Sequence, residues 1–491
     1  MTSQIPALQV VVPLLSAPIC LLIRNPSVTR VFAVGVTWAC LVMSAWLLHA
    51  VMGGGVIVYA FGGWKPPWGI AYSVDVVNAY VLLIVSAIAS VVLPVGPGAA
   101  AHSIPKGREY LFYASFLACL AGLLGVTITG DAFNLFVFLE ISSLASYTLI
   151  ALGKGRKALS AAFSYLVVGT IGATFILIGV GLMYQMTGTL NMADLAARLP
   201  AVERNRTLLA AFAFFSVGIS IKLAVFPMHQ WLPNAYAHAP AVVSAFLAST
   251  ATKVSYYVLL RIVFTLFGVH FVFEKLGLEL LFLPLSVAAI FVGSTAAIFQ
   301  NDLRRMLAYS SVAQIGYMTL GLTFVNLSGL TGGIVHLFNH ALTKGGLFLV
   351  AACVFNRVGS TAIDDLRGLG RRMPLTMAAF VVGGLALIGV PSTAGFVSKW
   401  YLVLGAIDRG WYAIAFLVVL SSLLSVVYVW RVIEVAYFSE APGDASRRDA
   451  PLWMLIPTWI LIGATVYFGL FTGLSVGMAS EAARQLLGIA S

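Results

Sequence analysis

Long apolar runs separated by short polar breaks are the feature that most constrains this chain of 491 residues. About 20 apolar residues in a helix cross the hydrocarbon core of a bilayer, and inside that core only helices and closed barrels satisfy their backbone hydrogen bonds. Only 9% of the residues are charged, against roughly 25% in soluble domains. The sequence therefore predicts an all-α polytopic membrane protein and excludes soluble enzymes, disordered tails and nucleic-acid-binding modules.

The apolar runs predict about 14 membrane-spanning helices by this length criterion, an even number that places both termini on the same side of the membrane. The expected spans are 5–23, 31–52, 71–95, 110–129, 132–152, 160–187, 207–227, 241–268, 278–300, 304–325, 329–356, 374–404, 410–438 and 452–476.

Basic residues are distributed unevenly over the loops between these spans. Cytoplasmic loops are enriched in Lys and Arg, so we expect the odd-numbered loops in the cytoplasm and both termini outside it. The expected location is the cell inner (plasma) membrane. The odd-numbered loops hold Arg24, Arg30, Lys106, Arg108, Lys154, Arg156, Lys157, Arg304, Arg305, Arg357, Arg367, Arg371, Arg372, Arg447 and Arg448. The even-numbered loops and the C-terminus hold Lys65, Arg198, Arg204, Arg206, Lys275, Arg409 and Arg484.

The sequence carries no motif for a metal or a cofactor. Its four cysteines are far apart and form no CxxC pair, which argues against an iron–sulfur cluster or a structural zinc site. It also lacks a Walker loop and a GxGxxG fingerprint. We therefore expect no cofactor, no metal, no nucleic-acid partner and no catalytic chemistry performed by this chain itself.

Several ionisable residues fall inside the apolar runs. A charge at the bilayer centre costs about 2.5–3.5 kcal/mol on insertion scales, so a purely structural chain has little reason to keep them. Arg261 and Arg431 fall near helix ends, where snorkelling to the membrane surface and a function are equally good explanations. The others include Glu140, Glu434, Lys222, Lys253, His336, His340, Lys344 and Lys399.

Glu140 has no cation within one helical turn, so its carboxylate needs a partner on another helix or a proton. A helix–helix hydrogen-bond anchor is the structural alternative. Lys222 follows Gly218 and precedes Pro227, which has no backbone donor. This pattern predicts a broken helix beside a hydrated cavity, in which the charge state of Lys222 depends on whether Glu140 is close.

His336, His340 and Lys344 recur every four residues and so share one helix face about 12 Å long. An HxxxH pair can bind zinc, but a general-base glutamate and a third ligand are missing, which favours a relay of titratable groups. Lys253 lies among polar residues that indicate a wet helix face. Lys399 follows Pro391 in a second Pro/Gly-broken span, and two such spans are typical of a repeated transporter core.

Residues 222–240, KLAVFPMHQWLPNAYAHAP, resemble the signature of the antiporter-like subunits shared by respiratory complex I, membrane-bound hydrogenases and Mrp cation/proton antiporters. Residues 336–348 and 395–399, HLFNHALTKGGLF and GFVSK, resemble that family as well. The resemblance covers nearly the whole chain, which would form a single transmembrane domain of residues 1–491.

The resemblance implies helices 1–3 in residues 1–109, a last helix in 450–491, and two inverted five-helix repeats between them. The repeats would cover residues 110–270 and 278–440, with breaks in helices 7 and 12. The structural motif residues would be Pro227, His229, Trp231, Pro233, His238 and Pro391.

The run GDAFNLFVFLE, residues 130–140, is most similar to the D-type component of the Mrp antiporter. This implies a proton-translocating subunit of a multi-subunit Na⁺/H⁺ antiporter. Glu140 and Lys222 would form a charge pair, and Lys253 would link it to the centre. The central relay would be His336, His340 and Lys344, and Lys399 would end the second half-channel. Expected partners are other membrane subunits, protons, a monovalent cation (Na⁺) and membrane lipid.

The alternative is a proton-pumping membrane subunit of a complex I-like NADH:quinone oxidoreductase or a membrane-bound hydrogenase. About 15 residues follow the last expected span, too few for the long lateral helix that the resemblance assigns to the large complex I subunit. A stand-alone carrier is disfavoured, because the family works as laterally packed assemblies.

Overall fold

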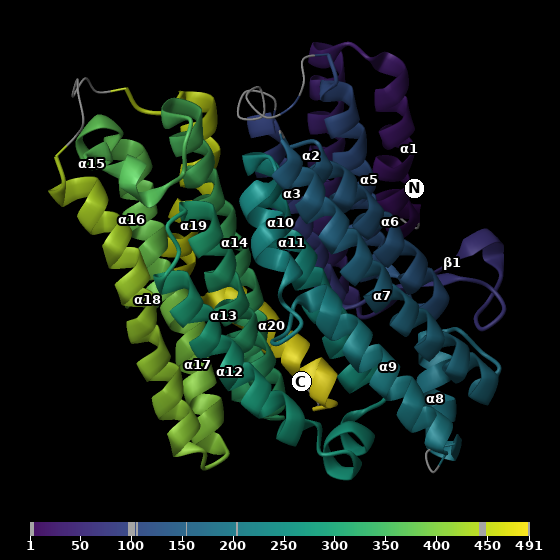
Figure 1. Cartoon of the computed structure of the whole chain (residues 1–491). Helices are drawn as coiled ribbons and strands as arrows, with labels where there is room; N and C mark the ends of the chain where they lie inside the picture. The colour runs from purple at the N-terminus through teal and green to yellow at the C-terminus, as the bar shows by residue number, and fades with distance from the viewer. Residues whose placement is uncertain are drawn as a thin grey trace.

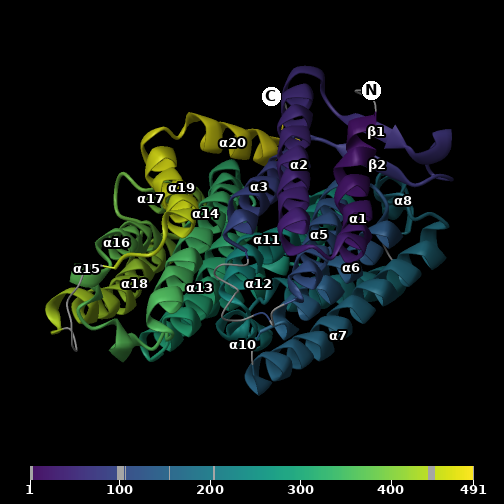
Figure 2. The same cartoon turned by 90° about the horizontal axis from the view of Figure 1, so that it is seen from above.

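The computed structural model describes residues 4–96, 104, 107–153, 155–202, 205–440 and 448–489. Most of its long helices run parallel or antiparallel to one another (Figure 1), with the N-terminal half on one side and the C-terminal half on the other (Figure 2). The basic residues Lys106, Lys154, Arg204 and Arg447, used above to predict sidedness, lie outside the described residues. The expected sidedness therefore stays a prediction.

Twelve helices of the described chain are long and apolar enough to cross a membrane, which confirms the all-α polytopic fold. They are α1 (Ile5–Ile23), α2 (Pro26–Gly54), α3 (Val76–Val92), α5 (Glu109–Ile128), α6 (Ala132–Ala151), α7 (Arg156–Thr187), α9 (Arg206–Leu223), α11 (Ala241–Leu260), α12 (Leu278–Ile298), α14 (Leu327–Val358), α18 (Tyr412–Phe438) and α19 (Leu452–Leu470).

The two other expected spans correspond to α13 (Leu303–Thr323) and to the pair α16 (Pro374–Ile388) and α17 (Ala394–Asp408). Neither meets the same criterion, because α13 carries many hydroxyl and amide side chains and α16 is short. The count of 14 remains a prediction. Shorter elements are α8 (Met192–Val202), α10 (Trp231–His238), α15 (Leu369–Arg372), α20 (Gly473–Leu487), the 3₁₀ turns Phe61–Gly63, Leu93–Val95 and Ile363–Leu366, and the π-helical segments Arg261–Leu266 and His270–Lys275.

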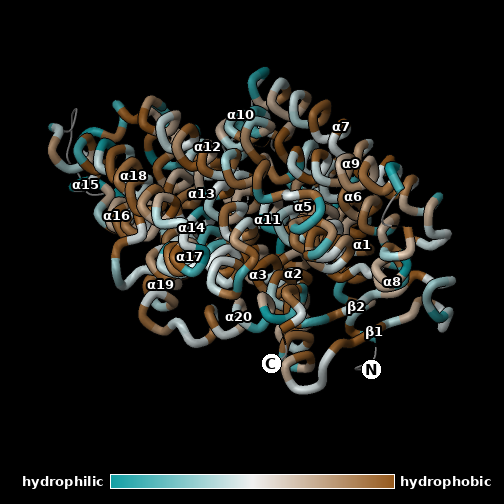
Figure 3. The backbone as a smooth tube through the Cα atoms, turned by 90° about the horizontal axis from the view of Figure 1, so that it is seen from below, coloured by the Kyte–Doolittle hydropathy of each residue, from teal (hydrophilic) through white to brown (hydrophobic). Residues whose placement is uncertain are grey.

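Helices α11 and α14 form the centre of the molecule. In the most apolar stretch of each, 94% of the residues are buried, against 39% in α7 and 33% in α18. In Figure 3 hydrophobic segments predominate along the helices, and hydrophilic segments lie at the helix ends and also between the helices. The polar interior and the apolar periphery match a chain whose outer helices face lipid.

Both expected helix breaks are present. Helix α9 ends at Leu223, Ala224 adopts a left-handed conformation (φ 61°), and α10 starts seven residues later. The indole of Trp231 reaches back over this break and donates to the carbonyl of Ile221 (2.9 Å), which also accepts the backbone N–H of Ala224 (3.2 Å). Helix α16 ends at Ile388, followed by Gly389 at φ 88°, a conformation that favours glycine.

One backbone arrangement occurs once in each half of the chain. In this arrangement, which we call a clasp, an aspartate caps one helix and forms a β-bridge with a residue that follows another. Asp131 caps α6 and Asp302 caps α13, each accepting the backbone N–H three residues later, at 2.7 and 3.0 Å. Asp131 also forms a β-bridge with Asn191, and Asp302 with Ala362, each just after a 32-residue helix. The two clasps lie at opposite faces, since α8 follows one and α15 the other (Figure 1).

The expected third and last spans differ from the structure. Residues 71–74, expected to begin the third span, form the strand β2 (Ala71–Val74), which pairs antiparallel with β1 (Ile57–Ala60). The third helix, α3, starts later because Asp75 and Asn78 make a capping box at its N-terminus. The last span ends at Leu470, and α20 forms a separate helix that lies across the bundle (Figure 2) and packs on α14 and α3.

Candidate functional site

Glu140 and Lys222 form an ion pair between α6 and α9. The ammonium of Lys222 donates to Glu140 Oε1 at 3.0 Å and to Ser143 Oγ at 2.7 Å. The side chain of Lys222 is 4% exposed and that of Glu140 is 22% exposed. The partner that the carboxylate of Glu140 requires therefore lies on another helix, and Glu140 is the more accessible residue of the pair.

The position of Lys222 follows from the broken helix. It lies in the last turn of α9, where the free carbonyl groups give the helix end a partial negative charge that favours a cation. The break turns the chain away immediately afterwards, so the side chain extends toward α6 rather than along a continuing helix. Ser143 lies three residues after Glu140 and therefore on the same helix face.

A small hydroxyl-lined cavity of about 20 Å³ continues from Lys222 toward α11. It is large enough for one water molecule and has the polar partners that a buried water needs. Its lining includes Ser142, Ser146 and Tyr165 on one side and Ser255 of α11 on the other. The cavity therefore joins the ion pair to the helix that carries Lys253.

Lys253 is fully buried near the middle of α11. Its ammonium donates to the carbonyl of Ala248 and to Thr252 Oγ1. No carboxylate among the described residues lies within ion-pair distance of it. The group is therefore solvated by dipoles alone, and any charge on it is poorly compensated in a low-dielectric interior.

The stripe on α14 has the expected order. The rings of His336 and His340 are nearly parallel (14°) with centroids 6.2 Å apart. His336 Nδ1 contacts Ser398 Oγ at 2.9 Å, and Lys344 donates to the carbonyl of Leu307 (2.8 Å) and to a serine hydroxyl of α13. Both nitrogens of His340 and Nε2 of His336 are buried without a partner among the described residues. Such groups need water to satisfy them.

Lys399 lies in α17, beside the second break. Its ammonium donates to the carbonyl of Ile388 (2.8 Å) and to Ser422 Oγ (3.0 Å), with the carbonyl of Leu387 at 3.3 Å. The ring of Tyr317 lies 4.9 Å away, at cation–π distance. The carbonyls are the ones that the end of α16 leaves free, so the break itself solvates this lysine.

The helices that carry these groups pack in a continuous row. Helix α9 packs on α11, α11 on α14, and α14 on α17. The described residues contain no group of three or more His, Cys, Asp or Glu that could hold a metal ion. The row therefore consists of ionisable side chains that follow one another from helix to helix.

The motif residues shape the two breaks. Trp231 stacks on Tyr165 with ring centroids 3.9 Å apart. His229 lies in the first break and stacks on Phe226. Pro233 is buried in the first turn of α10, where a missing N–H is tolerated. His238 is the last residue of α10, and Pro391 lies exposed in the second break.

The structure separates the two arginines whose roles the sequence left open. Arg431 donates to the carbonyls of Ile298 (2.8 Å) and Gln300 (2.9 Å) and so caps the end of α12. Arg261 instead forms a buried ion pair with Asp75 at the C-terminal end of α11. No pattern in the sequence indicated this pair. The hydroxyl partners of the lysines were also missed, although the spacing of Ser143 from Glu140 could have indicated one of them.

Residues 129–425 match the protein family described as NADH:quinone oxidoreductase/Mrp antiporter, TM. The chain is 43% identical to the N-type component of the NADH-quinone oxidoreductase of Desulforudis audaxviator, over 96% of both chains. It is 31% identical to the D-type component of the Na⁺/H⁺ antiporter of Alkalihalophilus pseudofirmus, over 91% of this chain and 89% of the other.

A chain in the structure of the Mrp complex from Dietzia sp. DQ12-45-1b has the same fold. The TM-score is 0.91 at 26% identity, covering 99% of this chain and 97% of that chain. The motif resemblance noted in the sequence is thereby confirmed over nearly the whole length. This chain belongs to the NADH:quinone oxidoreductase/Mrp antiporter family of membrane proteins.

Proposed function

We propose that this chain translocates protons as one subunit of a multi-subunit membrane complex. The observation that supports the proposal is the row of buried ionisable groups on packed helices, with an ion pair at one end. The row runs from Glu140 and Lys222 through Lys253 to the stripe on α14 and ends at Lys399. Such intramembrane groups are expensive and typically mark ion pathways.

The ion pair provides the step that starts transfer. A proton that reaches the partly exposed carboxylate of Glu140 cancels its charge. Lys222 then keeps only neutral acceptors, the protonated carboxyl group and the hydroxyl of Ser143, and its uncompensated charge becomes unfavourable in the low-dielectric interior. The excess proton on Lys222 is driven through the hydroxyl-lined cavity toward Lys253.

The first candidate for the driving reaction is exchange of a monovalent cation, Na⁺, for protons. The D-type relatives and the fold match to an Mrp complex support it. In this candidate the chain lies in the plasma membrane with both termini outside the cytoplasm, surrounded by lipid and by other antiporter subunits. The two repeats would cover residues 110–270 and 278–440.

The second candidate is proton pumping driven by electron transfer on other subunits. The higher identity, 43%, is with a protein named as a component of an NADH-quinone oxidoreductase. Both candidates use the same row of residues, so the partner subunits decide between them.

Purification of the intact complex through a tag on this chain tests the choice. Antiporter subunits and proton movement on a Na⁺ pulse in vesicles would support the first candidate. Redox subunits and proton movement on addition of an electron donor would support the second. A chain that purifies alone, with no proton movement under either condition, would contradict both.

Thiol labelling tests the sidedness. A cysteine introduced at Arg156 should react with an impermeant reagent only from the cytoplasm, and one at Asn205 only from outside, because the first lies in a basic loop. The four native cysteines are buried, so the unmodified chain is the control. Reversed labelling would overturn the predicted topology.

A further inference from the structure

A second ion pair lies at the end of α11 and takes no part in the row. The guanidinium of Arg261 donates to the carboxylate of Asp75 and to the hydroxyl of Tyr257 (3.0 Å). Gln485 of α20 donates to the other carboxylate oxygen at 3.1 Å. The Arg261 and Asp75 side chains are only 11% and 10% exposed. Since desolvation offsets much of the attraction in a buried pair, stability alone explains it poorly.

The pair lies one step beyond the row on the same helix face. Lys253, Tyr257 and Arg261 follow one another at four-residue intervals, so Arg261 lies about 12 Å from Lys253 along the helix. At Arg261 the helix changes to a π-helical segment, a feature common at functional sites. The face of α11 that holds Lys253 therefore leads directly to the Arg261–Asp75 pair.

A cavity of about 280 Å³ lies beside this pair, between the hairpin, α3, α8 and α11. It is large enough for several water molecules. The exposed hairpin residues Val58 and Pro66 line it, so it reaches the surface that carries α8. Its polar lining includes Ser73, Asp75, Asn78, Thr129, Tyr257 and Arg261. We call it the polar port.

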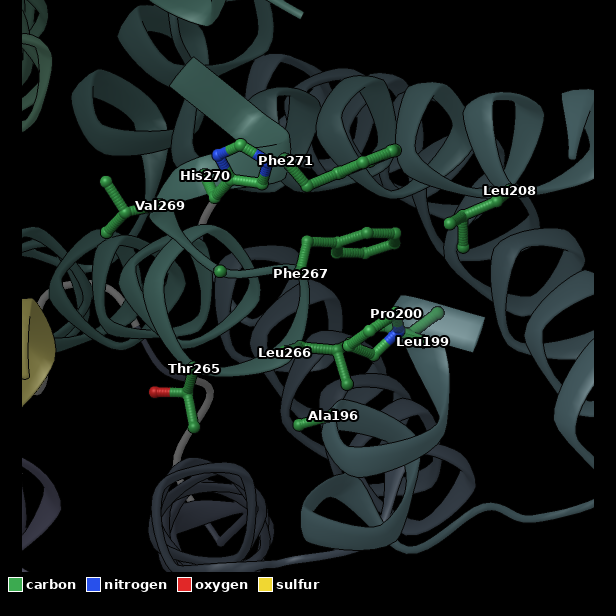
Figure 4. A pocket seen from close by; sticks show the side chains of 11 residues that line it. Ala196, Leu199, Pro200, Leu208, Thr265, Leu266, Phe267, Val269, His270 and Phe271 are labelled. Atoms are coloured by element: carbon green, nitrogen blue, oxygen red, sulfur yellow. The ribbon is translucent and has the colours of Figure 1, made fainter. Parts of the chain in front are cut away.

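A second cavity of about 280 Å³ on the other side of Thr265 provides a contrast. Figure 4 shows Leu199, Leu208 and Phe267 around this space, with Thr265 at its edge. The ionisable side chain in its lining is His270, which pairs with the exposed Glu274 (2.6 Å). The described lining of this cavity contains no buried charged side chain that could bind a proton, whereas that of the polar port does.

We propose that the polar port connects the proton row to the solution on the α8 face, outside the cell in the predicted topology, and that the Arg261–Asp75 pair is its gate. The inference rests on the proposed function. A proton that leaves Lys253 passes Tyr257 and binds the carboxylate of Asp75, which breaks the charge pairing with Arg261. Release of that proton to water in the port restores the pair.

Two alanines of α8 provide a matched test. Ala193 lines the polar port and Ala196 lines the apolar cavity, three residues away. Each is replaced by cysteine, and vesicles that hold the intact complex are treated with an impermeant cationic methanethiosulfonate from the α8 face. Modification of Ala193→Cys should lower proton movement about tenfold or more, the scale by which charged clefts change ion access, and a reductant should restore it. Modified Ala196→Cys should keep its activity.

The outcomes separate the port from the proposed function. If Ala193→Cys is fully modified and still moves protons normally, the proposed port is wrong while the proposed function stands. The same holds if modification lowers the proton movement of Ala196→Cys as much as that of Ala193→Cys. Modification of Ala193→Cys only from the face opposite α8 would also overturn the proposed port. If the unmodified variants and the parent chain move no protons, the proposed function itself fails.

A second measurement tests the gate. Asp75→Asn keeps a good cap for α3 but leaves the charge of Arg261 unbalanced. In the Ala193→Cys background, this change should make an anionic thiol reagent react about tenfold faster relative to a cationic one. An unchanged ratio would show that Arg261 does not act on the port.

Discussion

Lys222 and Lys399 each lie beside a helix break, yet their surroundings differ in charge. The ammonium of Lys222 lies 3.0 Å from a carboxylate oxygen of Glu140. The ammonium of Lys399 contacts two backbone carbonyls, a serine hydroxyl and an aromatic ring. A buried cation beside a carboxylate is compensated by a full opposite charge, whereas dipoles compensate it only in part.

This difference in compensation determines which kind of change alters the stability of each lysine's charge. A proton that binds Glu140 directly changes the electrostatic energy of the ammonium of Lys222. At Lys399 no carboxylate of the described chain is near, and two of its three acceptors belong to the end of α16. The first site therefore responds to charge, and the second responds to the conformation of the break.

The largest effect is expected from Glu140→Gln, which removes the charge but keeps an acceptor for Lys222. The buried ammonium of Lys222 can release its proton when the carboxylate charge is gone, so the complex should still assemble. Because protonation of Glu140 can then no longer drive the transfer, proton movement in vesicles should fall about a hundredfold or more. Glu434→Gln, at an exposed carboxylate of α18, is the control. Full activity of Glu140→Gln would reduce this residue to a packing role.

Removal of Lys222 and of Lys399 should lower the stability of the complex by different amounts. Lys222→Met leaves the partly buried carboxylate of Glu140 unpaired, which costs up to about 3–5 kcal/mol, whereas Lys399→Met leaves neutral acceptors unpaired, which costs about 1–3 kcal/mol. Both variants should lose proton movement, but the amount of assembled complex should fall more for Lys222→Met. Adding Glu140→Gln should restore assembly of Lys222→Met. Equal loss of assembly in the two single variants would break the comparison.

Arginine at position 222 distinguishes a charge anchor from a proton carrier. Lys222→Arg keeps a positive partner for Glu140, so assembly should survive and the variant should be less damaged than Lys222→Ala. Arginine does not release its proton at accessible pH, so proton movement should stay at about a tenth or less of the parent value. Near-parental exchange at matched expression would rule out proton release by Lys222.

The smallest effects are expected from the two serines. Ser143→Ala and Ser422→Ala each remove one hydroxyl acceptor, worth about 0.5–1.5 kcal/mol, and should slow proton movement by roughly two- to tenfold. Ser143→Ala should be the more severe, since Lys222 then depends on Glu140 alone, while Lys399 retains two carbonyls. The reverse order, measured in the same vesicles, would show that the break does not solvate Lys399.

The sequence predicted the parts of the site that have a residue signature. Proline and glycine indicated both breaks, and an isolated carboxylate required a partner on another helix, which the structure shows to be Lys222. The neutral acceptors of Lys399 could not be predicted, because a free backbone carbonyl leaves no trace in residue identity. The Arg261–Asp75 pair was missed because it joins α3 and α11, which are far apart in the chain, and no residue pattern indicates that these two helices pack together.

The paired clasps have a consequence for how the chain acquires a direction. Five crossings separate Asp131 from Asp302, namely α6, α7, α9 with α10, α11 and α12. An odd number of crossings sets the second clasp at the opposite face, so one backbone pattern is used twice, once upright and once upside down. These two clasps therefore favour neither face of the membrane over the other. Under the proposed function, any preference for one direction of proton flow must come from parts of the chain that are not repeated, and the ion pair of Glu140 with Lys222, which Lys399 lacks in the described chain, is one of them.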